Sequence, residues 1–283
     1  MHGRQDLRFE GDGFTMVSLY MIYFSILSFV GYLYECLAML IWTGEWDNRG
    51  FLFGPVIPIY GAGALAGTLL FHYSLKDHTP MMVFLVSVIA SAVLEYVVHY
   101  GLEKAFHAYW WDYSKAPLNI NGRICLPASL GFGVAGLLII YVINPFLIPL
   151  LERIPKELAA FLGMLLAALF AADTMLTVST LSDFIHRVER IDERINERMD
   201  NFVDNHMESY KGIGDTFYTA VDHMQESGKK LIDKRIEKAS DSLDFARSYI
   251  LTRVKCFKGN KAAKRMNHIL NRIKRRIKRK EDE

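Results

Sequence analysis

Two polar segments that contain glycine and proline carry many of the side chains in this chain that could do chemistry. The first, residues 48–55, reads Asn-Arg-Gly-Phe-Leu-Phe-Gly-Pro, and the second, residues 119–127, reads Asn-Ile-Asn-Gly-Arg-Ile-Cys-Leu-Pro. We name them hinge 1 and hinge 2. Each lies between apolar segments and follows a predicted helix with a glutamate, Glu35 or Glu95. A charged group at membrane depth costs roughly 2.5–3.5 kcal/mol, so these charges should face a partner or a water-filled site rather than lipid.

A glutamate and an arginine accompany each hinge, which indicates paired charges. We expect Glu35 and Glu95 each to lie within reach of Arg49 or Arg123, because an unpaired carboxylate at this depth would take up a proton or be exposed to water. Such a pair fits either a solute-binding site or a clamp between helices, since breaking a buried pair is costly even where it adds little net stability. Asp173 favours the binding role, because it lies deep in an apolar stretch with no cation nearby in sequence.

Ten polar residues near the hinges and in the apolar stretches form one predicted cluster, either substrate-binding or structural. We assign no catalytic residue and no cofactor. We also assign no metal ligand, because His99 and His107 lack a matching set of cysteines or carboxylates at ligand spacing. The cluster comprises Glu35, Asn48, Arg49, Tyr60, Glu95, Glu103, Asp112, Asn121, Arg123 and Asp173.

An aromatic segment, residues 109–113 (Tyr-Trp-Trp-Asp-Tyr), precedes hinge 2. Tyrosine and tryptophan are enriched at membrane interfaces, because one end of the ring is apolar and the other is hydrated. We therefore interpret the segment as an interfacial belt rather than as a box for a cationic ligand. Asp112 within it has two candidate partners, the backbone of the next turn and Arg123.

The order glutamate, polar hinge and glycine-rich helix start occurs twice, with the glycines at 61–63 and 131–133. A parallel repeat of two helices would place both hinges on one side of the membrane. The alternative is chance similarity, because any two helical hairpins can share glycines and an arginine and the spacings here differ.

Apolar helices are the elements that must position these side chains. About seven Lys and Arg lie in residues 14–183 and about 24 in residues 184–283, an asymmetry that separates a membrane part from a soluble part. Stretches of about 20 apolar residues, enough to cross a ~30 Å hydrocarbon core, fit the first part five times. They show no two-residue alternation, so strands are a poor alternative. We predict an all-α, multipass transmembrane bundle of about five spans: 14–43, 57–75, 81–105, 124–150 and 158–184.

The basic excess after residue 184 predicts a cytoplasmic C-terminus. Five spans then place the N-terminus outside and both hinges on the cytoplasmic side. The loop charges do not themselves decide the orientation, and a re-entrant segment around 51–58 would change the count. The predicted organisation is an N-terminal tail (1–13), a transmembrane domain (14–184), a cytoplasmic helical region (185–260) and a polybasic amphipathic helix (261–283).

The region after the last span has the pattern of amphipathic helices. Apolar residues recur at three- and four-residue steps from 185 to 202, and a second helix is expected at 216–257. A coiled coil between chains and a hairpin within one chain are equally open. Residues 261–280 contain about ten Lys and Arg, no acidic residue and one apolar face, which predicts an interfacial helix on anionic lipid rather than a nucleic-acid tail. The predicted membrane-surface residues are Lys264, Arg265, Arg272, Lys274, Arg275 and Arg276.

Several strings in the first 180 residues are distinctive: Glu35, hinge 1 followed by Pro-Ile-Tyr-Gly at 58–61, Leu-Glu-Lys-Ala-Phe-His-Ala-Tyr-Trp-Trp-Asp-Tyr-Ser at 102–114, Asn119, and Gly-Arg-Ile-Cys-Leu at 122–126. Together they resemble the bacterial family described as putative ABC-transporter type IV, or CmpB-like. The resemblance implies a multipass protein of the bacterial inner membrane with a transport role, and it supplies no substrate and no catalytic residue. It also implies a separate ATP-binding subunit, because the sequence holds no phosphate-binding loop of the Gly-x-x-x-x-Gly-Lys-Ser/Thr type.

Three functions fit these observations. The first is a permease-like or ligand-binding membrane subunit. The alternative is a membrane scaffold or sensor, whose acidic residues are packing clamps and whose C-terminal helices recruit a partner. The third is a membrane enzyme acting on lipid or envelope precursors, because paired carboxylates can do acid–base work. The expected partners are membrane lipid, an ATP-binding subunit and other copies of this chain, and we expect no nucleic acid. The sequence does not indicate the substrate, the transport direction or the energy source.

Overall fold

The computed structural model describes residues 12–73, 75, 78–207, 250–258, 263–264, 266–271 and 274–275. These residues are mostly helical, with only a few two-residue strands, which confirms the all-α prediction. The chain divides into two compact units. Unit 1 contains Met1–Ala105 and Tyr109–Thr177, and unit 2 contains Phe106–Ala108 and Val178–Glu283.

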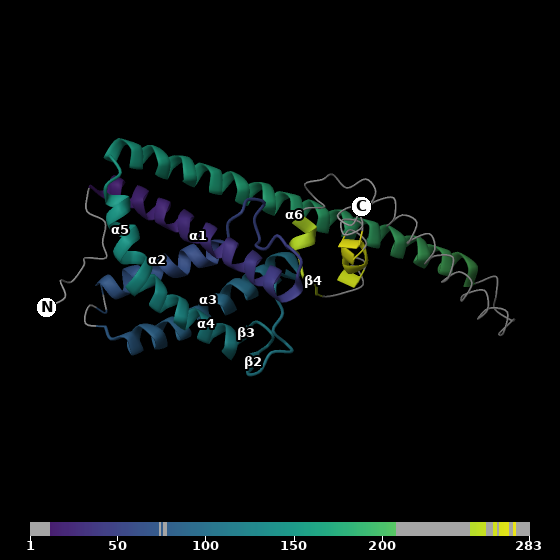
Figure 1. Cartoon of the computed structure of the whole chain (residues 1–283). Helices are drawn as coiled ribbons and strands as arrows, with labels where there is room; N and C mark the ends of the chain where they lie inside the picture. Colours follow the sequence, from purple (N-terminus) through teal and green to yellow (C-terminus); the bar gives the residue numbers. More distant parts are fainter. Residues whose placement is uncertain are drawn as a thin grey trace. The chain divides into compact units, whose positions relative to one another are not determined.

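Unit 1 is a bundle of apolar helices that lie along one another (Figure 1). Within the part of the chain that the structure describes, four helical stretches are long and apolar enough to cross a membrane: Gly13–Thr43, Pro80–Phe106, Leu126–Glu152 and Lys156–Arg190. The elements of the bundle are α1 (Gly13–Thr43), α2 (Pro58–Tyr73), α3 (Pro80–Phe106), α4 (Leu126–Leu138), the π-helical turn η1 (Ile139–Ile143), α5 (Asn144–Glu152) and the first part of α6 (Lys156–Met207).

Local chemistry fixes the two ends of α1. Asp12 caps its N-terminus, because the Asp12 Oδ1 atom accepts a hydrogen bond of 2.8 Å from the N–H of Thr15. The same contact lowers the pKa of the Asp12 carboxyl. At the other end Gly44 adopts a left-handed conformation, with φ 74°, and its N–H bonds to the Leu40 carbonyl. This is a common way for a helix to stop, because glycine has no Cβ to penalise positive φ.

The stretch from α4 to α5 changes its hydrogen bonding beside a proline. Pro145 has no N–H to donate, and its ring crowds the preceding turn, so the ordinary helical ladder is interrupted there. The π-helical turn η1 accommodates the proline: the N–H of Asn144 bonds to the Ile139 carbonyl, five residues back. The helical path therefore continues through Leu126–Glu152 despite the proline.

The second crossing of the bundle is not a single long helix. α2 has 16 residues and is about 24 Å long, short of a ~30 Å hydrocarbon core. The loop before it, residues 44–57, runs back along α1, and the N–H of Ile57 bonds to the Ser28 carbonyl at 3.0 Å. About 22 Å of α1 separate Ser28 from Thr43, so α2 begins inside the bundle (Figure 1). Four of the five predicted spans thus correspond to long helical stretches, and the fifth, 57–75, corresponds to the shorter helix α2.

Glycines allow neighbouring helices to approach closely, as is usual in membrane bundles. A Cβ atom at Gly31 would overlap the Tyr60 ring, and one at Gly61 would overlap Ser28, so α1 and α2 cross at their glycines. α3 and α4 are packed in a similar way, because a Cβ atom at Gly133 would lie 2.6 Å from a valine of α3. The buried apolar cluster of the bundle comprises Leu19, Ile22, Tyr23, Leu27, Ala64, Phe71, Val83, Ile140, Ile148, Leu151 and Ala159.

Unit 2 combines the second part of α6 with a short strand and helical segments near the C-terminus. The strand β4 (Cys256–Phe257) pairs with β1 (Ala108–Tyr109), whose first residue belongs to this unit. The N–H of Lys258 also bonds to the His107 carbonyl at 2.6 Å. Residues far apart in sequence therefore share one core, in which the buried apolar side chains include Leu181, Phe184, Ile185, Val188, Ile250, Leu251, Val254, Phe257, Met266, Ile269 and Leu270.

The C-terminal segment is held by side-chain contacts to the backbone. The Asn267 side chain accepts a bond from the N–H of Phe257 and donates one to its carbonyl, both at 2.8 Å. Lys274 Nζ donates to the Val254 carbonyl at 2.9 Å. The apolar face expected to meet lipid is buried at its described positions, Met266, Ile269 and Leu270.

Several sequence expectations for this region fall outside the described residues. Arg265, Arg272, Arg276 and most of the helix expected at 216–257 are among them. The described end of that predicted helix is helical only to Arg253, and β4 follows. Lys264 and Arg275 are exposed. A membrane-surface role for the basic residues stays a prediction.

Candidate functional site

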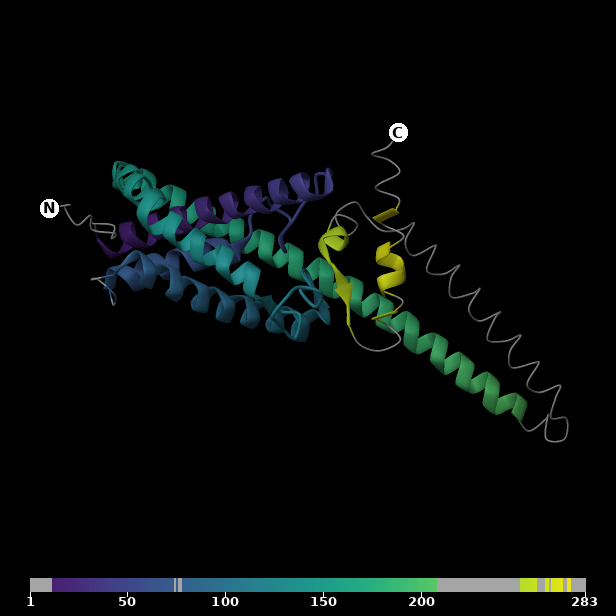
Figure 2. The same cartoon turned by 60° about the horizontal axis from the view of Figure 1, so that its bottom comes forward.

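Hinge 1 and hinge 2 lie at the same end of unit 1, the end where α1 stops (Figures 1 and 2). Ring contacts join the segments around them: the centroids of Phe51 and Trp110 are 5.1 Å apart, and those of Tyr60 and Phe132 are 5.6 Å apart. Trp110 is buried, so the aromatic segment 109–113 folds partly inward instead of forming an exposed belt. The two hinges therefore contribute to one region of the protein.

Glu35, on α1, makes the central polar contacts near hinge 1. Its Oε1 accepts a hydrogen bond of 2.5 Å from the hydroxyl of Tyr60, in the first turn of α2. Its Oε2 lies 3.8 Å from Nε of Arg49, and Nη1 of the same arginine lies 3.5 Å from Asp47. The expected pairing of Glu35 with a hinge arginine is confirmed, although Arg49 is shared between two carboxylates.

Asp173, on α6, binds the backbone of hinge 1. Its Oδ1 accepts from the N–H of Phe53 and its Oδ2 from the N–H of Gly54, both at 2.9 Å. Thr177, one turn later on α6, accepts from the Phe53 N–H at 3.2 Å and donates to Asp173 at 3.3 Å. A Cβ atom at position 54 would lie 2.8 Å from the Asp173 carboxylate, which explains the glycine there. Asp173 thus anchors a loop at membrane depth, and its geometry supports a clamp.

Hinge 2 folds as a β-hairpin. Its strands, β2 (Asn119–Ile120) and β3 (Ile124–Cys125), pair in antiparallel register. Asn121 and Gly122 have φ values of 53° and 69°, and the N–H of Arg123 bonds back to a β2 carbonyl at 3.0 Å. Positive φ at both central positions is the requirement of a type I′ turn, and Asn-Gly is its preferred sequence. The Asn-Gly pair could therefore have predicted this hairpin from the sequence.

Arg123, at the end of that turn, is fully engaged by α3. Its Nη2 donates to Glu103 at 2.8 Å and its Nη1 to the hydroxyl of Tyr96 at 2.7 Å. The guanidinium also lies over the rings of Tyr96 and Tyr100, 4.9 and 5.1 Å from their centroids. The hydrogen bond to Glu103 raises the pKa of Arg123. This arrangement fixes hinge 2 against the last turns of α3.

Glu95, on α3, lacks the arginine that we expected. It is 5% exposed, its Oε1 accepts a bond of 3.4 Å from the Tyr113 hydroxyl, and its Oε2 is buried without a hydrogen-bond partner among the described residues. The prediction that a hinge arginine pairs with Glu95 was wrong, because Arg123 pairs with Glu103, two turns further along the same helix. Burial, together with the charges of Glu95 and Glu35, raises the pKa of Tyr113 and keeps its hydroxyl protonated as a donor.

The two hinges are attached to their preceding helices in similar ways. The Tyr32 hydroxyl of α1 donates to Oδ1 of Asn48 at 2.6 Å, and Nδ2 of Asn121 donates to the Tyr96 hydroxyl of α3 at 3.4 Å. In both cases a tyrosine close to the helix glutamate binds a hinge asparagine. This likeness is what a repeat would produce, and the repeat stays a prediction.

The predicted cluster thus separates into groups with different surroundings. Sequence reasoning missed the tyrosines that complete these groups, although Tyr32 and Tyr96 lie within one helical turn of Glu35 and Glu95. Asp112 accepts from the N–H of Ser114 at 2.9 Å and so caps its own turn. Glu35 contacts Tyr60 and Arg49, and Glu95 contacts Tyr113. Glu103, Asn121 and Arg123 form a second group with Tyr96. Asn48 bonds to Tyr32, and Asp173 holds hinge 1.

The family model described as putative ABC-transporter type IV matches residues 22–178, more than half of the chain. The chain belongs to this family. Comparison with curated proteins and with solved structures gave no match. The matched range contains both hinges and every residue of the candidate cluster from Glu35 to Asp173. Its apolar helices make this type IV family member a membrane protein.

This family member also carries a buried polar group that sequence reasoning missed. The Tyr23 hydroxyl donates to Oδ1 of Asn144 at 2.8 Å, Nδ2 of Asn144 donates to Oγ1 of Thr68 at 3.0 Å, and the two hydroxyls lie 3.0 Å apart. Asn144 is 0% exposed. The three side chains satisfy one another and tie α1, α2 and α5 together beside η1. An Asn-Pro pair inside an apolar stretch was the available signal.

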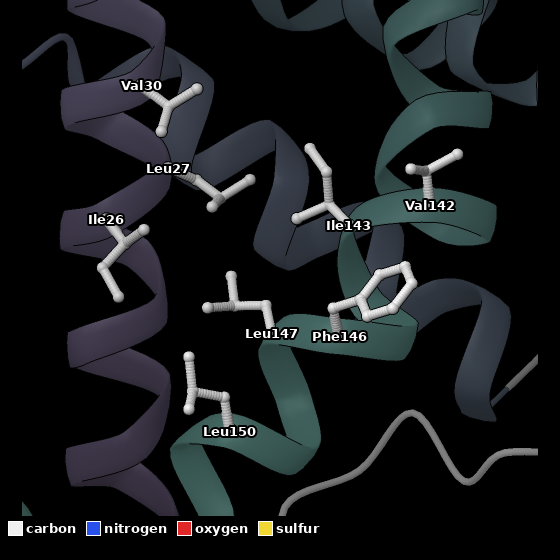
Figure 3. Close-up of a pocket in the computed structure, with 8 residues that line it drawn as sticks. All are labelled: Ile26, Leu27, Val30, Val142, Ile143, Phe146, Leu147 and Leu150. Carbon is white, nitrogen blue, oxygen red and sulfur yellow. The ribbon is translucent and has the colours of Figure 1, made fainter.

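A groove between α1 and the η1–α5 segment of this type IV protein has a different chemistry. Its volume is about 410 Å³, and Figure 3 shows apolar side chains of both elements along it, with Leu27 and Ile143 extending toward each other. Such a surface suits contact with other apolar groups, not recognition of a polar solute. It is lined by Ile26, Leu27, Val30, Val142, Ile143, Phe146, Leu147 and Leu150.

Proposed function

We propose that this chain is the membrane-spanning, solute-translocating subunit of an ABC-type transporter. The observation that carries the proposal is the broken second crossing: loop 44–57 reaches the depth of Ser28, and α2 begins there beside Glu35. In membrane transporters, solutes and coupling ions bind where helices are discontinuous and polar groups gather. Non-helical backbone at membrane depth is tolerated only where it is buried in protein or lines a water-filled cavity.

The packing of unit 1 supports a mechanism in which two helix pairs move against each other. Tight glycine contacts make α1 and α2 one pair and α3 and α4 another. The two pairs meet at the tilted rings of Tyr60 and Phe132, and the first pair is also bonded to Asn144 of α5. Glu35 with Tyr60 belongs to the first pair, and Glu95 with Tyr113 belongs to α3 and the loop after it. Rocking of one pair against the other would open and close access to these carboxylates.

The energy for such movement would come from a partner. The sequence has no phosphate-binding loop of its own, so the proposal requires a separate ATP-binding polypeptide. Membership of the type IV family is consistent with that association. The location that fits best is the bacterial inner membrane with the C-terminus in the cytoplasm, where ATP is available.

The test is to isolate the chain from its native membrane in mild detergent and to measure ATP hydrolysis by whatever purifies with it. We expect a P-loop protein at a fixed ratio to the chain. We also expect ATP hydrolysis to change at least severalfold in Glu35→Gln, which disrupts the hinge cluster. Glu152→Gln is the matched control, because Glu152 is an exposed carboxylate at the end of α5. Isolation without an ATP-binding protein, or equal hydrolysis in wild type and Glu35→Gln, would contradict the proposal.

A scaffold or sensor is a second candidate, and unit 2 supplies the observation that favours it. Residues Phe106–Ala108, which directly follow the membrane part of α3, belong to the same compact unit as the C-terminal segment. A soluble regulator bound to unit 2 would therefore act on residues that connect α3 to hinge 2. Chemical cross-linking from the exposed Lys255 and Lys264 in intact cells tests this alternative. The scaffold or sensor function requires that one soluble protein is cross-linked at both lysines. Cross-links to an ATP-binding subunit alone would favour the transporter.

A further inference from the structure

The carboxylates near the hinges are not balanced by cations in the described part of the chain. Glu35 has Arg49, 3.8 Å away, and that guanidinium also meets Asp47, whose side chain is 48% exposed and therefore solvated. Glu95 makes no ion pair within the same described residues, although it is 5% exposed. The partly exposed Glu35, the buried Glu95 and Arg49 together thus carry one more negative charge than positive charge.

The Oε2 atom of Glu95 is where that charge has no partner. It is buried and makes no hydrogen bond among the residues that the structure describes, while Oε1 accepts one long bond from Tyr113. Glu35 adds to the negative potential at both Glu95 and Tyr113. An isolated buried carboxylate is strongly disfavoured unless a positive charge accompanies it.

The groups around Glu95 make their own contacts with other partners. His99, one turn further along α3, has its Nε2 at 3.2 Å from the Trp111 carbonyl and its Nδ1 at 3.9 Å from Glu103. Tyr113, from the loop before hinge 2, and Tyr60, from α2, are hydroxyl donors and not cations. Both leave oxygen lone pairs that a small cation could use.

We propose that Glu95, assisted by Glu35, binds one exchangeable monovalent cation at its Oε2 atom. Carboxylate and phenol oxygens are hard ligands, which suit a proton, an alkali ion or ammonium. One unit of positive charge neutralises the cluster. The inference rests on the proposed transport function, because it names the chemical class of an ion that the hinge cluster would bind and release as the helix pairs move.

Thermal unfolding of the purified full-length chain in detergent, followed by tryptophan fluorescence, tests the proposal in two arms. In the salt arm, sodium, potassium or ammonium replaces N-methylglucamine at constant pH and ionic strength. In the pH arm, the pH is lowered at constant N-methylglucamine. A cation that binds the native state raises Tm, and we expect a rise on the order of 5 °C near saturation. A response in the salt arm identifies a metal or ammonium ion, and a response in the pH arm alone identifies the proton.

Three variants decide whether the response belongs to Glu95. Glu95→Gln is already neutral and should lose it, whereas the exposed control Glu152→Gln should keep it. Glu35→Gln removes a neighbouring negative charge, so its midpoint should move severalfold toward higher cation concentration, and this readout holds even if Glu95→Gln does not fold. Absence of a response in wild type, an equal response in Glu95→Gln, or an unmoved midpoint in Glu35→Gln would overturn the inference. Because the assay contains no ATP-binding partner, its failure would leave the transport proposal standing.

Discussion

Asp173→Ala is the substitution that tests the clamp on hinge 1 most directly. The Asp173 carboxylate accepts from two consecutive backbone N–H groups, those of Phe53 and Gly54, at 2.9 Å each. Both residues are half-buried in a loop that is bonded to α6, so water can replace a lost acceptor only in part. The substitution should therefore loosen hinge 1 without altering the apolar core.

The magnitude follows from counting the donors that lose a partner. Phe53 keeps Thr177 Oγ1 as an acceptor at 3.2 Å, so Gly54 is the residue whose N–H is left unpaired. A hydrogen bond to a charged group contributes about 1.5–3 kcal/mol, and an orphaned buried donor costs about 1–3 kcal/mol. We expect local opening of hinge 1 to become easier by about 2–4 kcal/mol. Asp173→Asn keeps one acceptor oxygen and should show about half of that effect.

Amide hydrogen exchange measures the opening at single residues. A change of 2–4 kcal/mol corresponds to exchange about 30- to 700-fold faster at Phe53 and Gly54, since each 1.4 kcal/mol is a factor of ten. Thr174→Val is the matched control, because Thr174 is adjacent on α6 and its hydroxyl bonds to the Phe170 carbonyl of its own helix. Wild-type exchange rates at both amides in Asp173→Ala would refute the clamp.

Four further outcomes are expected. Gly31→Ala should lower the free energy of unfolding in detergent by about 1–3 kcal/mol, because its methyl group would overlap a tyrosine ring, whereas Gly67→Ala, with nothing within 4 Å of the new Cβ, should be tolerated. Asn144→Leu should lower the free energy of unfolding by about 1–3 kcal/mol in the same assay, since interhelical bonds in membranes contribute about 0.6–1.7 kcal/mol each and two are lost. An unchanged unfolding midpoint would mean that the hydrogen bonds among Tyr23, Asn144 and Thr68 do not stabilise the bundle. Asn267→Leu should expose the Phe257 amide to exchange at least tenfold faster, and Asn267→Asp, which keeps the acceptor, should retain part of its protection. Reporters fused at the two ends should place the N-terminus outside and the C-terminus in the cytoplasm, and two cytoplasmic termini would contradict the five-crossing topology.

Apolar length predicted most of the bundle, and it failed where the chain leaves helical geometry while staying apolar. Residues 51–59 are mostly apolar, so hydropathy continues smoothly into α2. The segment is held as a loop by Asp173 and Thr177 of α6, which accept hydrogen bonds from the Phe53 N–H and lie about 120 residues away in sequence. A long-range contact of this kind has no local signal.

The ion pairs of the candidate site were predictable where the two partners are close in sequence. They were ambiguous where one helix carries several carboxylates that could pair with the same arginine. Arg49 follows the helix of Glu35 directly, and that pair formed. Glu95 and Glu103 lie two turns apart on α3, and spacing alone did not say which of them would meet Arg123. The C-terminal segment was ambiguous for a related reason: an apolar face predicts burial, but the pattern does not distinguish lipid from protein as the surface that covers it.

The pairing of Phe106–Ala108 with the C-terminal segment has a consequence for biosynthesis. β4 is made about 150 residues after β1, which at translation rates of roughly 5–20 residues per second is a delay of roughly 8–30 s. During that interval the His107 carbonyl cannot receive the Lys258 N–H, and the loop that leads into hinge 2 is tethered at one end only. The helices of unit 1 can be threaded into the bilayer before this latch exists. A chain that the ribosome releases before residue 256 would therefore have its unit 1 helices but would lack the β1–β4 pairing.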